Sequence, residues 1–102
     1  MTESDEYTFE VADAFTEGLE ALQPAHLNKV MAFLRDYARY TPTTLIPGQL
    51  TALKGTWRGY YEYHISKALR LRYWVDEEQR VVKLRYLGKH NEWRRSQDAQ
   101  GR

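Results

Sequence analysis

Two histidines and several basic residues in the C-terminal half have the types and spacing needed to act on a phosphodiester. They lie within one stretch, residues 53–93, and are His64, Arg70, Arg72, Lys83, Arg85 and His90. Imidazole changes its charge near neutral pH, so it can give or take a proton. Cationic side chains bind phosphate oxygens and stabilise charge that develops during a reaction. The stretch therefore predicts a site that holds a phosphodiester and moves protons around it.

The period-two pattern of this stretch predicts three strands, at residues 58–66, 69–76 and 80–87. The short links between them favour antiparallel neighbours. Alternation leaves one set of side chains on an open face: Tyr60, Glu62, His64, Arg70, Arg72, Trp74, Lys83 and Arg85. The other set of side chains is expected to pack against the helical hairpin described below. Tyr86 is expected in this covered set, and Leu87 is expected on the open face. Gly88 is expected to end the third strand and to turn Lys89, His90 and Trp93 toward the open face.

The N-terminal half predicts the elements that cover the sheet. Residues 7–11 alternate like a short strand, and Asp13 is expected to cap a helix reaching about residue 22. Pro24 suits the first turn of a second helix, whose apolar stripe runs to about residue 40. Residues 41–49 read as a loop because they contain two prolines and a glycine. The predicted fold is α+β, with an N-terminal strand and a helical hairpin packed on an antiparallel β-sheet in the order β-α-α-β-β-β.

Length and composition narrow the class of protein. With 102 residues, the chain is expected to form a single domain over residues 1–102, with disordered tails at 1–6 and 96–102. Cysteine is absent, which excludes disulfides, thiolate catalysis and cysteine-based zinc sites. The acidic N-terminus has no apolar run, and no segment has the length of a membrane span. We therefore expect a cytoplasmic protein with no membrane partner.

The two halves of the chain differ in charge. Residues 1–53 carry three basic against eight acidic residues, a net of −5, whereas residues 54–95 carry eleven against five, a net of +6. Such an asymmetry favours an anionic partner on one surface, although a solvated sheet face gives the same composition.

Each candidate residue also has a structural interpretation. A single histidine on a strand, such as His64, is more often structural, and His90 alone fits an exposed turn. Arg70 and Arg85 can form cross-strand ion pairs with Glu62 or Asp76. Two imidazoles flanked by cations on one face favour function. RNA cleavage fits these residues best, with no metal and no cofactor, because a phosphate loop, a nucleophile elbow and a second carboxylate on that face are all missing.

The chain resembles the RelE/ParE superfamily of bacterial toxins, and within it the YafQ-like ribosome-dependent mRNA interferases. The resemblance is carried by LKG before the first of the three strands, by GYYEYHI and LRLRYWVD, and by VVKLRYLGKHNEW at the end. It covers roughly residues 7–95. It implies a toxin that cuts mRNA on the ribosome and is blocked by a cognate antitoxin, in a toxin–antitoxin hetero-oligomer.

The resemblance also implies roles for single residues. His90 matches a general-acid or phosphate-contacting position and Arg70 a phosphate-stabilising arginine, while His64 and Glu62 are the two candidates for the general base. The residues expected to bind nucleic acid are Lys54, Arg58, Arg72, Lys83, Arg85, Lys89, Trp93 and Arg94.

Two other functions share this fold in the superfamily. One is a ParE-like toxin that inhibits DNA gyrase without cutting RNA, and the two imidazoles weigh against it. The other is a degenerate member that binds antitoxin or RNA without cleavage. Thr51 and Ala68 motivate this second alternative, because some members carry an acidic residue or histidine at those positions.

Overall fold

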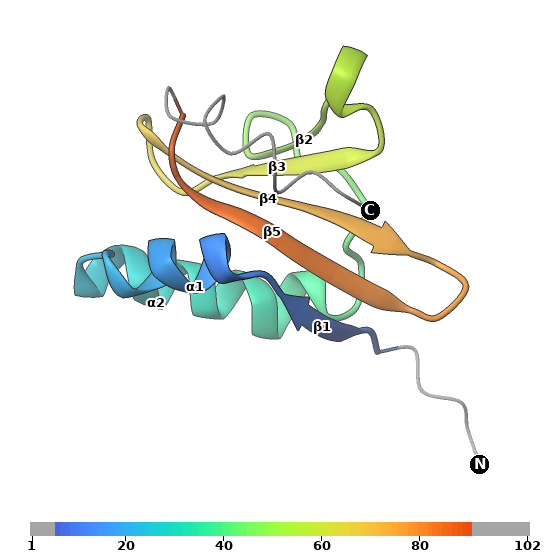
Figure 1. Cartoon of the computed structure of the whole chain (residues 1–102), viewed down its shortest axis with the longest axis horizontal. Helices are drawn as coiled ribbons and strands as arrows, with labels where there is room; N and C mark the ends of the chain where they lie inside the picture. The colour runs from blue at the N-terminus through green and yellow to red at the C-terminus, as the bar shows by residue number, and fades with distance from the viewer. Residues whose placement is uncertain (1–5, 91–102) are drawn as a thin grey trace.

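The computed structural model describes residues 6–90, which form two helices on one face of a five-stranded sheet (Figure 1). The expected tails, apart from Glu6, lie outside these residues, as do Trp93 and Arg94. The elements are β1 (Thr8–Val11), α1 (Asp13–Glu20), α2 (Pro24–Phe33), a π-helical turn (Leu34–Ala38), β2 (Leu50–Ala52), a 3₁₀ turn (Gly55–Trp57), β3 (Tyr60–His64), β4 (Leu69–Asp76) and β5 (Val81–Lys89). Within residues 6–90, no helix is both long and apolar enough to cross a membrane.

The sheet has the strand order β1-β5-β4-β3-β2. Its antiparallel pairs are β2–β3, β3–β4 and β4–β5, as the short links predict. The edge strand β1 instead runs parallel to β5, so the sheet is mixed. The other edge, β2, lies in a segment where no strand is predicted. The α+β fold with a helical hairpin on the sheet is confirmed, with these two additions at the edges.

The two helices form where the sequence predicts them, with small differences at their ends. The first helix begins at Asp13, but Ala12 is its N-cap residue, so the prediction that Asp13 caps it is wrong. Asp13 instead places a carboxylate in the first turn, where the helix dipole favours it. Pro24 opens α2 as expected. Beyond Phe33 the helix continues as a π-helical turn that ends at Ala38, slightly short of the predicted end.

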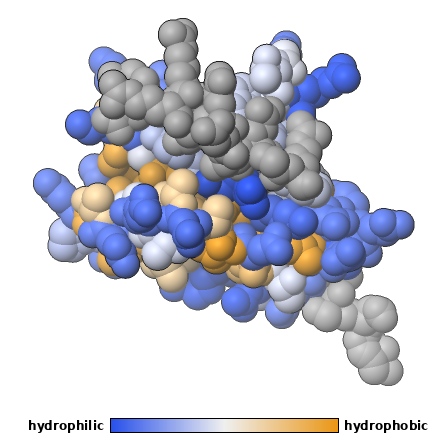
Figure 2. All heavy atoms as spheres, viewed as in Figure 1, coloured by the Kyte–Doolittle hydropathy of each residue, from blue (hydrophilic) through white to orange (hydrophobic). Residues whose placement is uncertain are grey.

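Aromatic side chains dominate the core between the helices and the sheet. The ring of Phe33 on α2 stacks on that of Tyr63 on β3, with centroids 3.8 Å apart. Phe15 and Val30 from the helices and Leu71 and Tyr73 from β4 are buried in the same cluster. Figure 2 shows hydrophobic surface along the line where the helices meet the sheet, between regions of hydrophilic side chains. We call this side of the sheet the helix face.

A β-bulge changes which residues of β5 reach each face. Tyr73 pairs with Leu84, but Arg72 pairs with Tyr86, so Arg85 is the extra residue of the bulge. Beyond this extra residue the alternation shifts by one. Leu87 therefore lies in the core opposite Leu71, and Tyr86 lies on the other side of the sheet. The prediction that Tyr86 is covered by the helices and Leu87 is open is wrong.

Candidate functional site

The buried carboxylate of Glu62 is the centre of a charged cluster on the face opposite the helices, which we call the site face. The cluster consists of Glu62, His64, Arg70, Arg72 and His90. Both nitrogens Nε and Nη2 of Arg72 donate hydrogen bonds to Glu62 Oε2, the first at 2.8 Å. His64 Nε2 and Arg70 Nε lie 3.3 Å and 3.7 Å from Oε1, and His90 Nδ1 lies 3.9 Å from Oε2.

The strand register explains this convergence. On β3 and β4, Glu62 pairs with Arg72 and His64 with Arg70. Directly paired residues point to the same face, so two successive pairs at alternate positions put four side chains side by side. Strand β5 then ends at Lys89, and His90 follows at once. Gly88 pairs with Arg70 inside β5, so the prediction that it ends the strand is wrong.

The Glu62–Arg72 ion pair is the rigid part of the cluster. Only 3% of the Arg72 side chain and 8% of the Glu62 side chain are exposed. Burial lowers the pKa of the Arg72 guanidinium, and the hydrogen bonds to Glu62 oppose this effect by favouring the charged form. Removing either partner would leave a buried charge uncompensated, which is costly. Arg72 therefore fixes the carboxylate to which the other members of the cluster turn.

Arg70 is held by the turn between β3 and β4. Its Nη1 donates hydrogen bonds to the carbonyl oxygens of Ser66, at 2.6 Å, and Lys67, at 3.0 Å. The Ser66 hydroxyl in turn accepts the backbone N–H of Leu69 at 3.2 Å. Arg70 thus contributes positive charge beside Glu62 and also holds the turn together. Sequence spacing predicts the first role and gives no sign of the second.

The two histidines differ in exposure. The side chain of His64 is 30% exposed, and its buried Nε2 faces Glu62. The side chain of His90 is 58% exposed. Its backbone N–H donates to the carbonyl of Ala68 in the β3–β4 turn, at 2.9 Å. The imidazoles therefore lie on one face of the sheet, and neither is sealed in the apolar interior.

Tyr86 is a site-face residue that sequence reasoning missed. It is buried, pairs with Arg72 across the strands, and donates its hydroxyl proton to the carbonyl of Lys89 at 2.9 Å. The alternation Val82, Leu84, Tyr86 conceals its position because the bulge is invisible to a period-two pattern. Two consecutive large apolar residues, Tyr86 and Leu87, are the available signal that the alternation breaks.

The other predicted nucleic-acid-binding residues do not join the cluster. Lys83 lies farther along the site face, with its Nζ 4.9 Å from the centre of the Trp74 ring and 3.4 Å from Glu10 Oε1. Arg85 is the bulged residue and is half-buried. Lys54 and Arg58 are exposed on either side of the 3₁₀ turn, and Lys89 is exposed at the end of β5. These residues lie outside the cluster.

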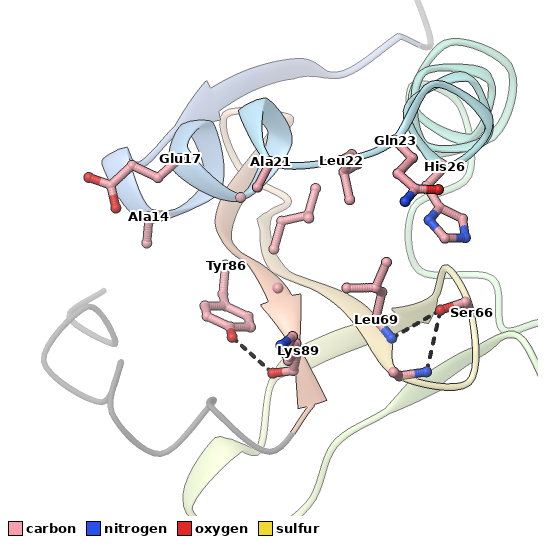
Figure 3. Close-up of a pocket in the computed structure, with 14 residues that line it drawn as sticks. Ala14, Glu17, Ala21, Leu22, Gln23, His26, Ser66, Leu69, Tyr86 and Lys89 are labelled. Carbon is pink, nitrogen blue, oxygen red and sulfur yellow. Dashed lines mark hydrogen bonds between the residues drawn. The ribbon is translucent and has the colours of Figure 1, made fainter.

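A hollow of about 640 Å³ lies at the same end of the sheet, between the corner of the helical hairpin and the β3–β4 turn (Figure 3). Its lining includes Leu22, Leu69 and Leu87, with His26, Tyr86 and Lys89 among the residues that carry polar groups. None of the five cluster residues lines it. This hollow therefore contains neither of the imidazoles of His64 and His90.

The cluster has the groups required for acid–base chemistry on a phosphodiester. One imidazole faces a carboxylate that can orient it, as in other histidine–carboxylate pairs. A second, more exposed imidazole lies beside the same carboxylate. Two guanidiniums outweigh the single carboxylate charge, so the cluster favours an anion. Among residues 6–90, no group of three or more histidine, aspartate or glutamate side chains is arranged to hold a metal ion.

Comparison with known proteins finds similarity in structure and no match to a protein family or a curated sequence. No protein-family model matches the chain, and no curated protein matches its sequence. Among solved structures, a YoeB/ParE toxin from Agrobacterium tumefaciens matches with a TM-score of 0.71 and 20% identity, covering 81% of this chain and 98% of that one. A chain of the RelBE2 toxin–antitoxin complex from Mycobacterium tuberculosis matches with a TM-score of 0.68 and 20% identity, covering 83% and 99%.

YafQ from Escherichia coli matches with a TM-score of 0.63 and 15% identity, over 86% of this chain and 98% of that one. The matched part of this chain thus covers nearly the whole length of each of these three chains. At these identities the likeness establishes the fold.

Proposed function

This chain has the fold of the RelE/ParE toxins, YafQ among them, and from that premise we propose that it is the toxin of a type II toxin–antitoxin system and cleaves mRNA on the ribosome. The observation that carries the proposal is the convergence of two imidazoles and two guanidiniums on the carboxylate of Glu62. Its partners are then the ribosome, the mRNA in it and a cognate antitoxin, and it acts in the cytoplasm.

The reaction assigns one proton transfer to each imidazole. Glu62 orients His64, which takes the proton of the ribose 2′-hydroxyl. The 2′-oxygen attacks the phosphorus, a new P–O2′ bond forms, and the P–O5′ bond breaks. His90, as imidazolium, gives its proton to the departing 5′-oxygen. The products are a 2′,3′-cyclic phosphate and a 5′-hydroxyl, and no cofactor takes part.

The arginines and the remaining basic residues supply the electrostatic part. Arg70 and Arg72 lie beside the carboxylate and offset the charge that accumulates on the phosphorane. A positioned acid or base contributes roughly 10²–10⁴-fold to a rate, and a positioned charge donor contributes on a similar scale. The phosphates of the flanking RNA are bound by basic residues outside the cluster: Lys54, Arg58, Lys83, Arg85 and Lys89. Trp93 and Arg94 stay predictions of the same kind.

Induction of the protein in growing bacteria tests the proposal. Wild-type protein should stop translation quickly and create new 5′ ends within translated mRNA. His90→Ala and Arg70→Ala should each relieve growth arrest in folded protein. His26→Ala is the matched control, because His26 lies on α2 and outside the cluster, and it should remain toxic.

Three outcomes would overturn the proposal. A DNA-damage response without new RNA ends would favour a gyrase-inhibiting toxin. Translated mRNA that stays intact while the protein still binds an antitoxin would favour a member that does not cleave. Full toxicity of both His90→Ala and Arg70→Ala would place the site elsewhere.

A further inference from the structure

Tyr86 is paired with Arg72 of the cluster across the strands and is not part of the acid–base pair proposed above. The bulge at Arg85 brings it to the site face, where it is 6% exposed and paired with Arg72. A tyrosine buried at this position needs a partner for its hydroxyl group. That hydroxyl donates to the carbonyl oxygen of Lys89, three residues further along the same strand, at 2.9 Å (Figure 3).

Gly88 makes this hydrogen bond possible. A Cβ atom added at position 88 would lie 2.7 Å from the Tyr86 hydroxyl oxygen and 3.0 Å from the ring carbon that bears it. Gly88 is not among the glycines with positive φ, so its backbone is open to any residue. The absence of a side chain is therefore required for space: the Tyr86 ring crosses the strand where Gly88 leaves room.

The two hydrogen bonds at the end of β5 hold one peptide group from both sides. Tyr86 donates to the carbonyl of Lys89, and the N–H of the same peptide bond, which belongs to His90, donates to the carbonyl of Ala68 at 2.9 Å. A peptide group is planar, so fixing its oxygen and its hydrogen fixes its orientation. That orientation in turn limits where the Cα–Cβ bond of His90 can point.

His90 needs such support more than His64 does. More than half of its side chain is exposed, and its Nδ1 lies 3.9 Å from the Glu62 carboxylate, beyond hydrogen-bond distance. A ring with so much exposure gains little orientation from packing. The orientation of the His90 imidazole therefore depends on the backbone at His90.

We propose that Tyr86 is a positioning residue for His90: its hydroxyl fixes the Lys89–His90 peptide group and so directs the His90 imidazole to the Glu62 cluster. A role for Tyr86 in catalysis rests on the function proposed above, in which His90 protonates the 5′-oxygen as the P–O5′ bond breaks. The claim that Tyr86 orients His90 does not depend on that function.

Spectroscopy on the free protein tests the orientation directly. In protein labelled with ¹³C-histidine, Tyr86→Phe keeps the ring but removes the hydroxyl, and it should shift the Cε1–H signal of His90. The His26 signal should stay in place. Tyr61→Phe is the matched control on the helix face, where Tyr61 stacks on Tyr73, and it should leave His90 unchanged. A His90 signal that is the same in Tyr86→Phe and wild type would overturn the proposal.

Gly88→Ala provides a second, independent variant. The added methyl group must push the Tyr86 hydroxyl away from the Lys89 carbonyl, so it should move the His90 signal in the folded protein much as Tyr86→Phe does. Combining the two substitutions should give less than the sum of the separate shifts, because both break the same hydrogen bond. Independent, fully additive shifts would contradict the proposed path through Tyr86.

Kinetics on programmed ribosomes test the catalytic consequence. Tyr86→Phe should lower kcat by about tenfold or more, part of the 10²–10⁴-fold that a general acid contributes, with little change in KM. An mRNA with sulfur in place of the scissile 5′-oxygen needs no acid, because a thiolate leaves unprotonated. On that substrate Tyr86→Phe and His90→Ala should both recover to nearly the wild-type rate.

The outcomes separate this inference from the proposed function. A Tyr86→Phe defect that sulfur does not relieve would show that Tyr86 acts otherwise than through His90. If wild-type protein cleaves no RNA at all, the proposed function fails, and the histidine signals still decide whether Tyr86 orients His90.

Discussion

The two faces of the sheet use the same strands in opposite ways. On the helix face, alternate residues of β3 and β4 such as Tyr63, Leu71 and Tyr73 are buried among aliphatic and aromatic groups. On the site face, the residues between them bury charge: Glu62 and Arg72 are paired, and as whole residues they are 6% and 3% exposed. Burial of apolar groups stabilises a fold directly, whereas a buried ion pair contributes little net stability and mainly fixes geometry. One face thus holds the protein together, and the other holds a set of charges in place.

The largest effect is expected from breaking the buried pair on the site face. Arg72→Leu leaves the Glu62 carboxylate buried without its partner, which should destabilise the protein by about 3–5 kcal/mol. Glu62→Leu together with Arg72→Leu should recover much of that loss, because an apolar pair of similar volume needs no compensation. Urea unfolding measures both. An Arg72→Leu variant that unfolds at the same urea concentration as the wild-type protein would contradict the burial of this pair.

The next effect tests a polar group on the helix face. The Tyr73 hydroxyl donates to the carbonyl of Pro42 at 2.6 Å. Tyr73→Phe removes this donor and leaves the carbonyl unpaired, at a cost of about 1–3 kcal/mol. The Glu62 cluster lies on the other face, so cleavage by the folded variant should be unchanged. Loss of cleavage without loss of stability would mean that the two faces are not separate.

Tyr73 also predicts a response to alkaline pH. Burial raises the pKa of the Tyr73 phenol well above its ordinary value. In the unfolded chain a tyrosine loses its proton near pH 10, so above that pH the unfolded state gains stability that the folded state does not share. The contribution of Tyr73 to the unfolding free energy should be constant below about pH 9 and should fall as the pH rises further. In the Tyr73→Phe variant the unfolding free energy should fall less steeply with pH than in the wild-type protein. An equal slope in both proteins would contradict the prediction.

A smaller effect is expected from the aromatic stack beneath the site. Phe33→Leu keeps an apolar side chain but loses the ring that stacks on Tyr63, at a cost of about 0.5–1.5 kcal/mol. Thermal unfolding measures this loss. Met31→Ala on the exposed side of the same helix is the control and should change the melting temperature less. A larger fall in melting temperature for Met31→Ala than for Phe33→Leu would contradict the assignment of Phe33 to the core.

The smallest effect on stability is expected from Lys83. Its amino group lies over the Trp74 ring and beside Glu10, and both contacts are partly exposed. Lys83→Ala should cost only about 0.2–1 kcal/mol, as exposed pairs do. It should nonetheless weaken RNA binding and make that binding less dependent on salt, because one phosphate contact is lost. Unchanged salt dependence would remove Lys83 from the nucleic-acid surface.

The sequence predicts the features that depend on the local spacing of residue types, such as strand positions and the faces of strands. Strand β4 lies where the alternation indicates, and the alternation of β3 and β4 correctly places Glu62, His64, Arg70 and Arg72 on one face. Pro24 marks the start of α2. These features depend on near neighbours in the chain, so a pattern of residue types suffices to find them.

The features that the sequence does not reveal depend on distant partners. The strand β2 has only three residues and forms because β3 lies beside it. The bulge at Arg85 depends on how β5 pairs with β4, and it moves Tyr86 to the site face; the adjacent apolar residues Tyr86 and Leu87 are its one trace in the sequence. Arg70 binds the carbonyls of a turn whose shape the residue types alone do not specify. Each is a consequence of how the elements meet.

The most direct test of the central claim is cleavage of a single-site mRNA on programmed ribosomes, with the scissile nucleotide carrying either its 2′-hydroxyl or a hydrogen. If the Glu62 cluster activates that hydroxyl, the ribonucleotide substrate is cut to a 2′,3′-cyclic phosphate and a 5′-hydroxyl, and the 2′-deoxy substrate stays intact. Cutting of the deoxy substrate, or an intact ribonucleotide substrate with folded wild-type protein, would contradict the account.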